Sequence, residues 1–390
     1  MHTKHVDLKN ARCDAHDQRE SAVGHAPSGT LDNCCKEEPA LGLFSEVVTA
    51  MRERFFGYLR GLPAPCGDDL IRHFSARLAR SGGRPVLGEY APFMLCDILG
   101  VPTQKVGEIA VPWLMLYETS ALTDDLADLQ VEDQAEAAFL LQFAFTEAMY
   151  CWRNYLEQFP FLWDELRRFQ KEAVCAAYSE LRDGHNRSGW QGGELAFGRK
   201  PALAKFCAAV LVALGKNRGL TREENEGLNQ LCTAVQLLDD ITDSESDLRL
   251  KQSNYVASAI VKWLRGLRGS AQLESTEITE EEAVGCLLLS GTLTRVAKFV
   301  VDCTHCGLDL LRVSKGTLTM GYFLSQVKWC ERLLEEERRL RVECPDGIET
   351  AKRALSRSSE EYHLFLGTPA GAVVWQKMKE CHSLMPRASQ

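Results

Sequence analysis

Helical periodicity is the feature that most constrains the fold of this chain. From Leu41 onward, apolar residues recur at spacings of three and four, which is the pattern of one face of an α-helix. The segments that follow it are 41–61, 69–80, 104–129, 135–157, 161–181, 195–214, 221–248, 254–267, 277–314 and 318–342. Glycine and proline gather between them, and no segment shows the alternation of a β-strand. The pattern predicts an all-α protein.

Length and segment order favour one large helical domain. The chain has 390 residues, and at ~150 residues per domain this allows one large domain or two to three smaller ones. Because no linker or tandem repeat separates the helical segments, we expect a single domain over 41–390. Residues 1–40 are polar and are predicted to form a disordered N-terminal extension, since they cannot bury enough apolar surface to fold.

Charge and hydropathy exclude several classes of protein. The chain has 45 basic and 54 acidic residues, a net charge of −9, which disfavours a broad nucleic-acid-binding surface. No apolar run reaches ~18 residues, so no membrane span is expected. The first 29 residues lack an apolar core, so no secretory signal is predicted. The 15 cysteines are then expected to be reduced, mostly buried thiols of a cytoplasmic protein.

An acidic cluster ends the apolar segment Val111 to Leu122. It consists of Asp124, Asp125 and Asp128. On a helix, Asp124 and Asp128 share a face because they are four residues apart. Carboxylates at the end of a core helix are costly unless they are paired or bound to a cation. The cluster is therefore a candidate metal site.

A second acidic cluster follows the largely apolar segment 228–238. Its members are Asp239, Asp240, Asp243 and Asp247, with Gln236 one turn earlier. The spacing i, i+4, i+8 predicts that Asp239, Asp243 and Asp247 form one stripe. Because like charges at this spacing destabilise a helix, two such clusters favour shared hard divalent cations, most simply Mg²⁺ held jointly with substrate phosphates. The alternative is that both clusters are solvated helix ends.

Four stretches in a fixed order resemble motifs of one enzyme family. Glu118-Thr-Ser-Ala-Leu-Thr-Asp-Asp-Leu-Ala-Asp128 is similar to the first aspartate-rich motif of trans-isoprenyl diphosphate synthases, and Gln236-Leu-Leu-Asp-Asp-Ile-Thr-Asp243 to their second. Arg199-Lys200-Pro201-Ala202-Leu203 resembles the stretch whose lysine contacts the substrate diphosphate. Asp247-Leu248-Arg249-Leu250-Lys251 resembles the basic tail that closes over it. The likeness extends from about residue 45 to 345.

The resemblance implies a single helical bundle of the isoprenoid synthase type with a central active-site cavity. It also implies ionisation of an allylic prenyl diphosphate with three Mg²⁺ ions. The implied metal ligands are Asp124, Asp125, Asp128, Asp239, Asp240, Asp243 and Asp247. The implied contacts to the substrate are Arg84, Lys200, Gln236, Arg249 and Lys251. The implied catalytic residues are Asp124, Asp128, Asp239, Asp243 and Lys200. Trp113 and Tyr117 could face the carbocation, with core packing as the simpler interpretation.

This chain departs from the family at two segments that chain-elongating members need, whereas the motifs for ionisation are present. Elongating members carry a Gly-Gly-Lys-Arg-x-Arg-Pro segment for isopentenyl diphosphate, which here is reduced to Gly82-Gly83-Arg84-Pro85. They also carry an Arg-Arg pair after the first motif, where residues 129–137 contain no basic residue. A second diphosphate would meet carboxylates and little positive charge, so its binding should be poor. The pattern resembles that of the synthase-derived (class IB) terpene synthases.

Three functions remain open from the sequence. A terpene synthase is favoured over a prenyltransferase, either chain-elongating or using another acceptor, and over a noncatalytic partner subunit. In the family, side chains four and five residues before the first aspartate form the floor of the chain pocket. Here these are Ser120 and Thr119, whose small size predicts a substrate of twenty carbons or more. Monomer and homodimer both stay open.

Overall fold

The computed structural model describes residues 39–80, 86–127, 133–183, 198–250, 254–268 and 278–385. Within these ranges the regular structure is helical and contains no strand, so the prediction of an all-α protein is confirmed. The chain divides into two units, Met1–Pro39 and Ala40–Gln390. The predicted extension over 1–40 lies outside the described residues, except that the first helix already begins at Pro39.

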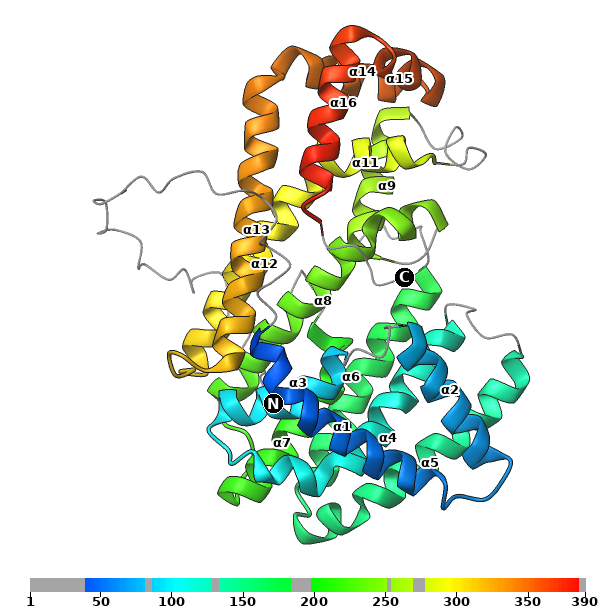
Figure 1. The fold of residues 1–390 in the computed structure, drawn as a ribbon, viewed down its shortest axis with the longest axis vertical. Helices are drawn as coiled ribbons and strands as arrows, with labels where there is room; N and C mark the ends of the chain where they lie inside the picture. Colours follow the sequence, from blue (N-terminus) through cyan, green and yellow to red (C-terminus); the bar gives the residue numbers. More distant parts are fainter. Residues whose placement is uncertain are drawn as a thin grey trace, which may run out of the picture. The chain divides into compact units, whose positions relative to one another are not determined.

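Helices follow one another with short connections along the described chain (Figure 1). They are α1 (Pro39–Leu59), α2 (Cys66–Arg80), α3 (Leu87–Leu99), α4 (Gln104–Ala127), α5 (Gln134–Gln158), α6 (Leu162–Asp183), α7 (Ala202–Lys216), α8 (Arg222–Leu250), α9 (Tyr255–Arg268), α11 (Glu280–Leu289), α12 (Thr292–Leu310), α13 (Leu318–Glu343), α14 (Pro345–Arg357), α15 (Ser359–Leu366) and α16 (Pro369–His382).

One hydrophobic core forms around α7. Every residue of α7 from Lys205 to Ala213 is buried, because the helix packs against α3, α4, α6 and α8. A helix that is apolar on all sides must be enclosed by other helices, and the segment Phe206-Cys-Ala-Ala-Val-Leu-Val212 fits that position. Buried residues of α1 to α6 complete this first core.

A second hydrophobic core forms between the later part of α8 and the helices α9 and α11 to α16. Three long helices contribute to both cores. Leu231 of α8, Leu308 of α12 and Phe323 of α13 belong to the first core. Ala234, Val296 and Cys330 of the same helices belong to the second. Because α8 packs along α12 and α12 along α13, these helices join the two cores (Figure 1).

The structure corrects the helix predicted over 277–314. It is broken into α11 and α12, which meet at 60°. Gly291 lies at the break with a φ of 71°, a left-handed conformation that glycine adopts without steric cost. After the bend, α11 packs against α8 and α16. Because apolar residues keep helical spacing on both sides of Gly291, the periodic pattern alone did not reveal the break.

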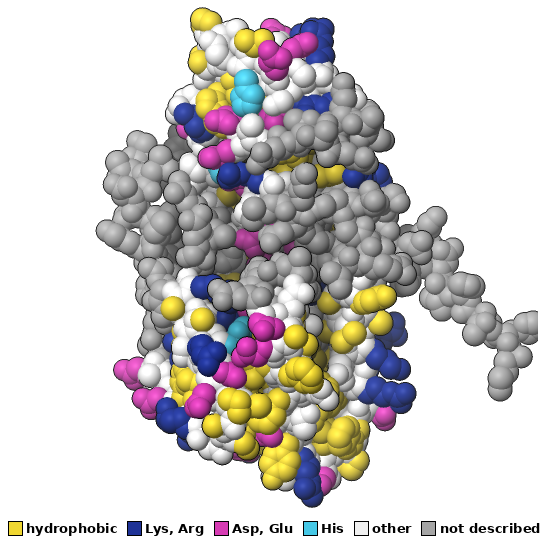
Figure 2. All heavy atoms as spheres, turned by 90° about the vertical axis from the view of Figure 1, so that its right-hand side faces the viewer, with side chains coloured by type: hydrophobic (Ala, Val, Ile, Leu, Met, Phe, Trp, Pro, Cys, Tyr) yellow, Lys and Arg dark blue, Asp and Glu magenta, His cyan; other side chains and the backbone are white. Residues whose placement is uncertain are grey.

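Among the described helices, none alone is long and apolar enough to cross a membrane. Only the bent pair of α11 and α12, taken together, reaches that length and composition. Figure 2 shows hydrophobic side chains exposed between charged ones on one face of the described surface. Large exposed apolar residues on α5 and α6 are Phe139, Tyr150, Trp163, Val174 and Tyr178. Such surfaces bind partners in many proteins, and a homodimer stays a prediction.

Candidate active site

The two acidic clusters lie on α4 and α8. Asp124 and Asp125 occupy the last turn of α4, and their side chains are 53% and 15% exposed. Asp128 lies outside the described residues. On α8, Asp239 is exposed, Asp243 is half-buried and Asp240 is buried. The carboxylates therefore differ in their access to a ligand, although the sequence presents them as equivalent.

Lys200 connects the two clusters. It lies in the short turn that leads into α7, and its Nζ is 3.5 Å from Oδ1 of Asp124. Its charge also acts on Asp243: burial raises the pKa of that carboxyl group, and Lys200 opposes the rise. One ammonium group thus interacts with a carboxylate from α4 and one from α8.

The turn that carries Lys200 is held closely against α8. A Cβ atom at Gly198 would lie 2.5 Å from Oγ1 of Thr233 and 2.7 Å from the carbonyl oxygen of Asn229, so only glycine allows this approach. Just after the turn, the buried Lys205 donates to Glu172 of α6 at 2.7 Å and to Oδ1 of Asn229 at 3.4 Å. These contacts between α6, α7 and α8 fix the backbone from which Lys200 projects.

Asp240 and Asp247 face the start of α9. Asp240 accepts hydrogen bonds from Nε2 of Gln236 at 3.0 Å and from the backbone N–H of Tyr255 at 3.1 Å. Asp247 accepts one from Nδ2 of Asn254 at 2.8 Å. The predicted stripe on α8 is therefore divided, because Asp247 is bonded at the start of α9 together with Asp240, whereas the charge of Lys200 acts on Asp243.

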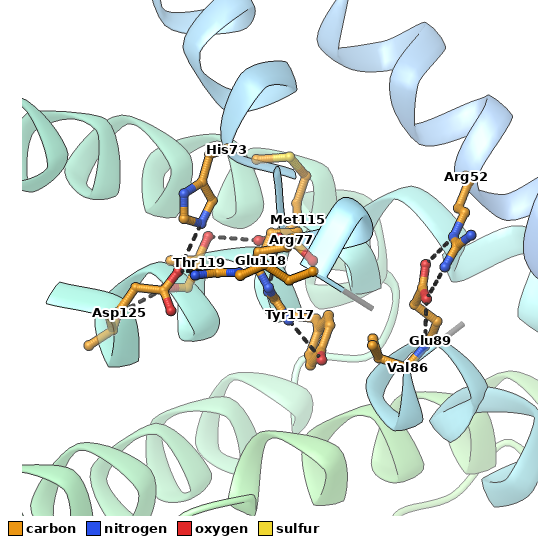
Figure 3. A network of polar contacts seen from close by, with 12 residues as sticks. Arg52, His73, Arg77, Val86, Glu89, Met115, Tyr117, Glu118, Thr119 and Asp125 are labelled. Atoms are coloured by element: carbon orange, nitrogen blue, oxygen red, sulfur yellow. Dashed lines mark hydrogen bonds and ion pairs between the residues drawn. The ribbon is translucent and has the colours of Figure 1, made fainter. Parts of the chain in front are cut away.

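A polar network joins α2 to α4 behind the first cluster (Figure 3). Arg77 donates to Oε2 of Glu118 at 3.0 Å and to the hydroxyl oxygen of Tyr117 at 3.1 Å. Arg80 donates to Asp125 at 3.1 Å, and Nε2 of His73 lies 3.6 Å from the same carboxylate. Arg77 and Arg80 of α2 thus fix the orientation of the last turns of α4.

Burial changes the pKa of two groups in this network. It raises the pKa of Glu118 to about 8, and the charge of Arg77 opposes the shift only in part. Burial also lowers the pKa of His73, with Asp125 acting in the opposite direction. The neutral form of the His73 imidazole is thereby favoured.

The predicted aromatic residues pack against α3. Nε1 of Trp113 donates to the carbonyl oxygen of Gly88 at 2.8 Å, and the Trp113 and Tyr117 rings stack with centroids 6.1 Å apart. The guanidinium of Arg77 lies 5.0 Å from the centroid of the Tyr117 ring. Both side chains therefore have structural contacts, which favours core packing over a role facing a carbocation.

Other predicted residues differ in their surroundings, and some lie outside the described ranges. Arg249 is paired with Glu245 on its own helix at 3.6 Å. Thr119 is buried and donates to the carbonyl oxygen of Met115 at 2.6 Å, whereas Ser120 is exposed. Arg84 and Lys251 belong to the ranges that the structure does not describe, so their predicted contacts with diphosphate stay predictions.

The chemistry of the donor set suits a hard cation. Asp124, Asp239 and Asp243 offer carboxylate oxygens, which Mg²⁺ prefers. Within the described ranges, no group of three or more His, Cys, Asp or Glu side chains is close enough to hold a metal ion. Since Asp128 falls outside those ranges, the three-ion arrangement stays a prediction.

The sequence reasoning missed several residues beside the clusters. His73, Arg77 and Arg80 stand at i, i+4 and i+7 on α2, a spacing that could have predicted one basic face. Tyr322 of α13 lies near Asp239: burial, and then the charge of Asp239, raise the pKa of its hydroxyl to about 12. Nothing in the sequence connects Tyr322 or Asn254 with the acidic clusters.

Comparison with known proteins finds no matching family model, no matching curated protein and no matching solved structure. The assignment of a function therefore rests on the motifs and on the geometry around Lys200.

Proposed function

We propose that this chain is a terpene synthase of the class I, isoprenoid synthase type. It would ionise an allylic prenyl diphosphate in the presence of Mg²⁺, cyclise or quench the resulting carbocation, and release diphosphate. The observation that supports this best is the position of Lys200, 3.5 Å from Asp124 of α4 and acting electrostatically on Asp243 of α8. Carboxylates from two distant motifs and a cation are thereby available to the same ligand.

Each residue of the site has a role in this proposal. Asp124, Asp239 and Asp243 would hold Mg²⁺, which supplies Lewis-acid stabilisation of the leaving diphosphate when it is bound. The ammonium group of Lys200 adds a positive charge where negative charge develops as the C–O bond breaks. The close approach of Gly198 to α8 holds the turn from which Lys200 projects, so the backbone of Lys200 needs little reorganisation during the reaction.

A prenyltransferase is the second candidate, and one observation favours it. Arg77 and Arg80 of α2 bring positive charge next to the first cluster, where elongating enzymes need cations for a second diphosphate. Both guanidinium groups are already paired with carboxylates, Arg77 with Glu118 and Arg80 with Asp125. The N–H groups of both residues are therefore already engaged within the protein, and we favour the synthase that uses one diphosphate.

Product analysis separates the candidates. The purified chain is incubated with Mg²⁺ and prenyl diphosphates of ten to twenty-five carbons, with and without isopentenyl diphosphate, and parallel samples contain EDTA. A hydrocarbon or alcohol from the allylic diphosphate alone supports the synthase. A longer diphosphate, formed only with isopentenyl diphosphate, supports elongation. No Mg²⁺-dependent consumption of any substrate would contradict both and would favour a noncatalytic partner subunit.

A further inference from the structure

We propose that Asn254 is a positioning residue that commits Asp240 and Asp247 to the corner between α8 and α9. Asp239 and Asp243 are then the α8 carboxylates left to face the substrate diphosphate. The inference rests on the proposed function for its catalytic part, and on the hydrogen bonds of Asn254 for its structural part. It changes the expectation that Asp247 is the third ligand of a metal-binding stripe.

The amide of Asn254 makes three hydrogen bonds at this corner and uses both of its N–H donors. Its Nδ2 donates to the backbone carbonyl of Asp240 and to Oδ2 of Asp247, both at 2.8 Å. Its Oδ1 accepts from the backbone N–H of Ala257 at 3.1 Å, which caps the first turn of α9. The side chain is only 2% exposed, so a lost bond would leave a buried polar group unsatisfied.

No other short side chain can make these three bonds. An amide offers two N–H donors and an acceptor oxygen on one rigid group, whereas aspartate only accepts and serine has one donor. Asp240 adds a second link, because its Oδ2 accepts from the backbone N–H of Tyr255 at 3.1 Å. The two carboxylates and Asn254 thus hold the start of α9 against α8.

Helical geometry explains why these two aspartates share a side. Each residue turns an α-helix by about 100°, so positions i and i+7 differ by only about 20°. Asp240 and Asp247 have that spacing. Asp247 lies about 80° around the helix from Asp239, because a repeat of four residues drifts by about 40° per step. The sequence stripe therefore drifts around the helix toward Asp240, with Asp243 about midway between Asp239 and Asp247.

A double-mutant cycle of melting temperatures tests the pairing of Asn254 with Asp247 without any substrate. Asn254→Asp keeps an oxygen to cap Ala257 but places a carboxylate against Asp247, and the melting temperature should fall. Adding Asp247→Asn restores a donor–acceptor pair between the two positions, and most of the loss should be regained. The matched control adds Asp239→Asn to Asn254→Asp and should regain little. Equal recovery with both partners would overturn the pairing.

Asn254→Ser provides a second variant in case Asn254→Asp does not fold. It retains a capping oxygen and loses the second donated hydrogen bond. Its melting temperature should fall, and adding Asp247→Asn should lower it little further, since Asp247 has already lost that amide. Additive losses in this pair would contradict a direct interaction between residues 254 and 247.

Kinetics with Mg²⁺ test the catalytic part. Asp243→Asn should lower kcat ~100-fold or more, the scale of a lost electrostatic contact in the transition state. Asp247→Asn should lower it far less, and the Asn254→Asp, Asp247→Asn pair should recover kcat along with stability. If Asp247→Asn keeps its melting temperature yet loses as much kcat as Asp243→Asn, Asp247 is a ligand and the inference is wrong. If the wild type is inactive, the proposed function fails while the double-mutant cycle still decides the role of Asn254.

Discussion

Lys200 lies 3.5 Å from Asp124, at the junction of two acidic clusters that the chain places on separate helices. An ammonium group between carboxylates reduces the repulsion that would otherwise separate the end of α4 from α8. The same charge opposes the effect of burial on the pKa of Asp243. Lys200 therefore has a structural role in this site in addition to the proposed contact with diphosphate.

Removing the charge of Lys200 should lower kcat and raise the pKa of Asp243. In Lys200→Met we expect kcat to fall ~100-fold, because one electrostatic contact to the leaving group is lost. The pKa of Asp243 should rise further, since Lys200 opposes the effect of burial there. NMR titration of the aspartate carboxyl carbons without metal measures this shift. The control is Lys216→Met at the other end of α7, which should leave both quantities near wild type.

The exposed carboxylates of the two clusters should be essential for turnover. Asp124→Ala or Asp239→Ala should lower kcat by more than ~100-fold and leave the circular dichroism spectrum unchanged. Asp302→Ala removes an exposed aspartate of α12 and serves as the control. Near-wild-type turnover in both Asp124→Ala and Asp239→Ala would exclude these clusters as the metal site.

Gly198→Ala should displace the turn that carries Lys200. The new Cβ would lie 2.5 Å from Oγ1 of Thr233, too close to be accommodated without movement of the turn. We expect a loss of ~1–3 kcal/mol of stability, and a fall in kcat with it. Gly266→Ala in α9 has open space around its Cβ and should be neutral or stabilising by up to ~1 kcal/mol. Urea unfolding of both variants at one pH measures the difference.

The pH dependence of stability should report the buried Glu118. Its pKa is raised from 4.5 to about 8, so between these values the unfolded chain has lost a proton that the folded chain retains. Stability then falls as pH rises through this window, by at most ~1.4 kcal/mol per pH unit from this group. Glu118→Gln keeps an acceptor for Arg77 but cannot ionise. The unfolding free energy of this variant, relative to that of the wild type, should therefore increase from pH 5 to pH 8. Parallel curves for the two proteins would show that Glu118 ionises normally.

Substitution of Ser120 tests the predicted chain length of the prenyl diphosphate substrate. If its small side chain lies at the floor of the chain pocket, Ser120→Phe should shift preference from twenty or more carbons toward ten or fifteen. A prenyl chain gains ~0.8 kcal/mol per buried CH₂ only where space exists. Ser120→Ala keeps the space and should keep the wild-type preference. A native preference for geranyl or farnesyl diphosphate that Ser120→Phe leaves unchanged would remove residue 120 from the pocket.

Periodicity predicted the long helices well, because their apolar faces repeat over many turns. The segment 221–248, for example, agrees with α8 at Arg222–Leu250 to within two residues at each end. It did not delimit α3, whose Leu87–Leu99 is apolar on most sides and contains Pro92, nor the short helices α14 to α16. The break at Gly291 also escaped it, since a glycine that ends a helix and one within a helix leave the same gap in a pattern.

The sequence identified the acidic clusters but not the different surroundings of their members. Asp239 and Asp240 are neighbours in the chain, yet Asp239 is exposed and Asp240 is enclosed by Gln236 and the start of α9. That difference depends on which helix covers which side of α8, and it is determined by contacts between residues distant in sequence. The spacing of His73, Arg77 and Arg80 could have predicted a basic face on α2. The contact of that face with α4 is known only from the three-dimensional structure.

The helices α8, α12 and α13 belong to both hydrophobic cores. Melting either core disrupts helices on which the other depends, so the unfolding of the two cores should be coupled. A substitution deep in the second core, far from Lys200, would then weaken the support of Asp239 and Asp243 as well. Loss of activity on heating should follow loss of structure closely, with no temperature range in which a folded remnant persists without its site.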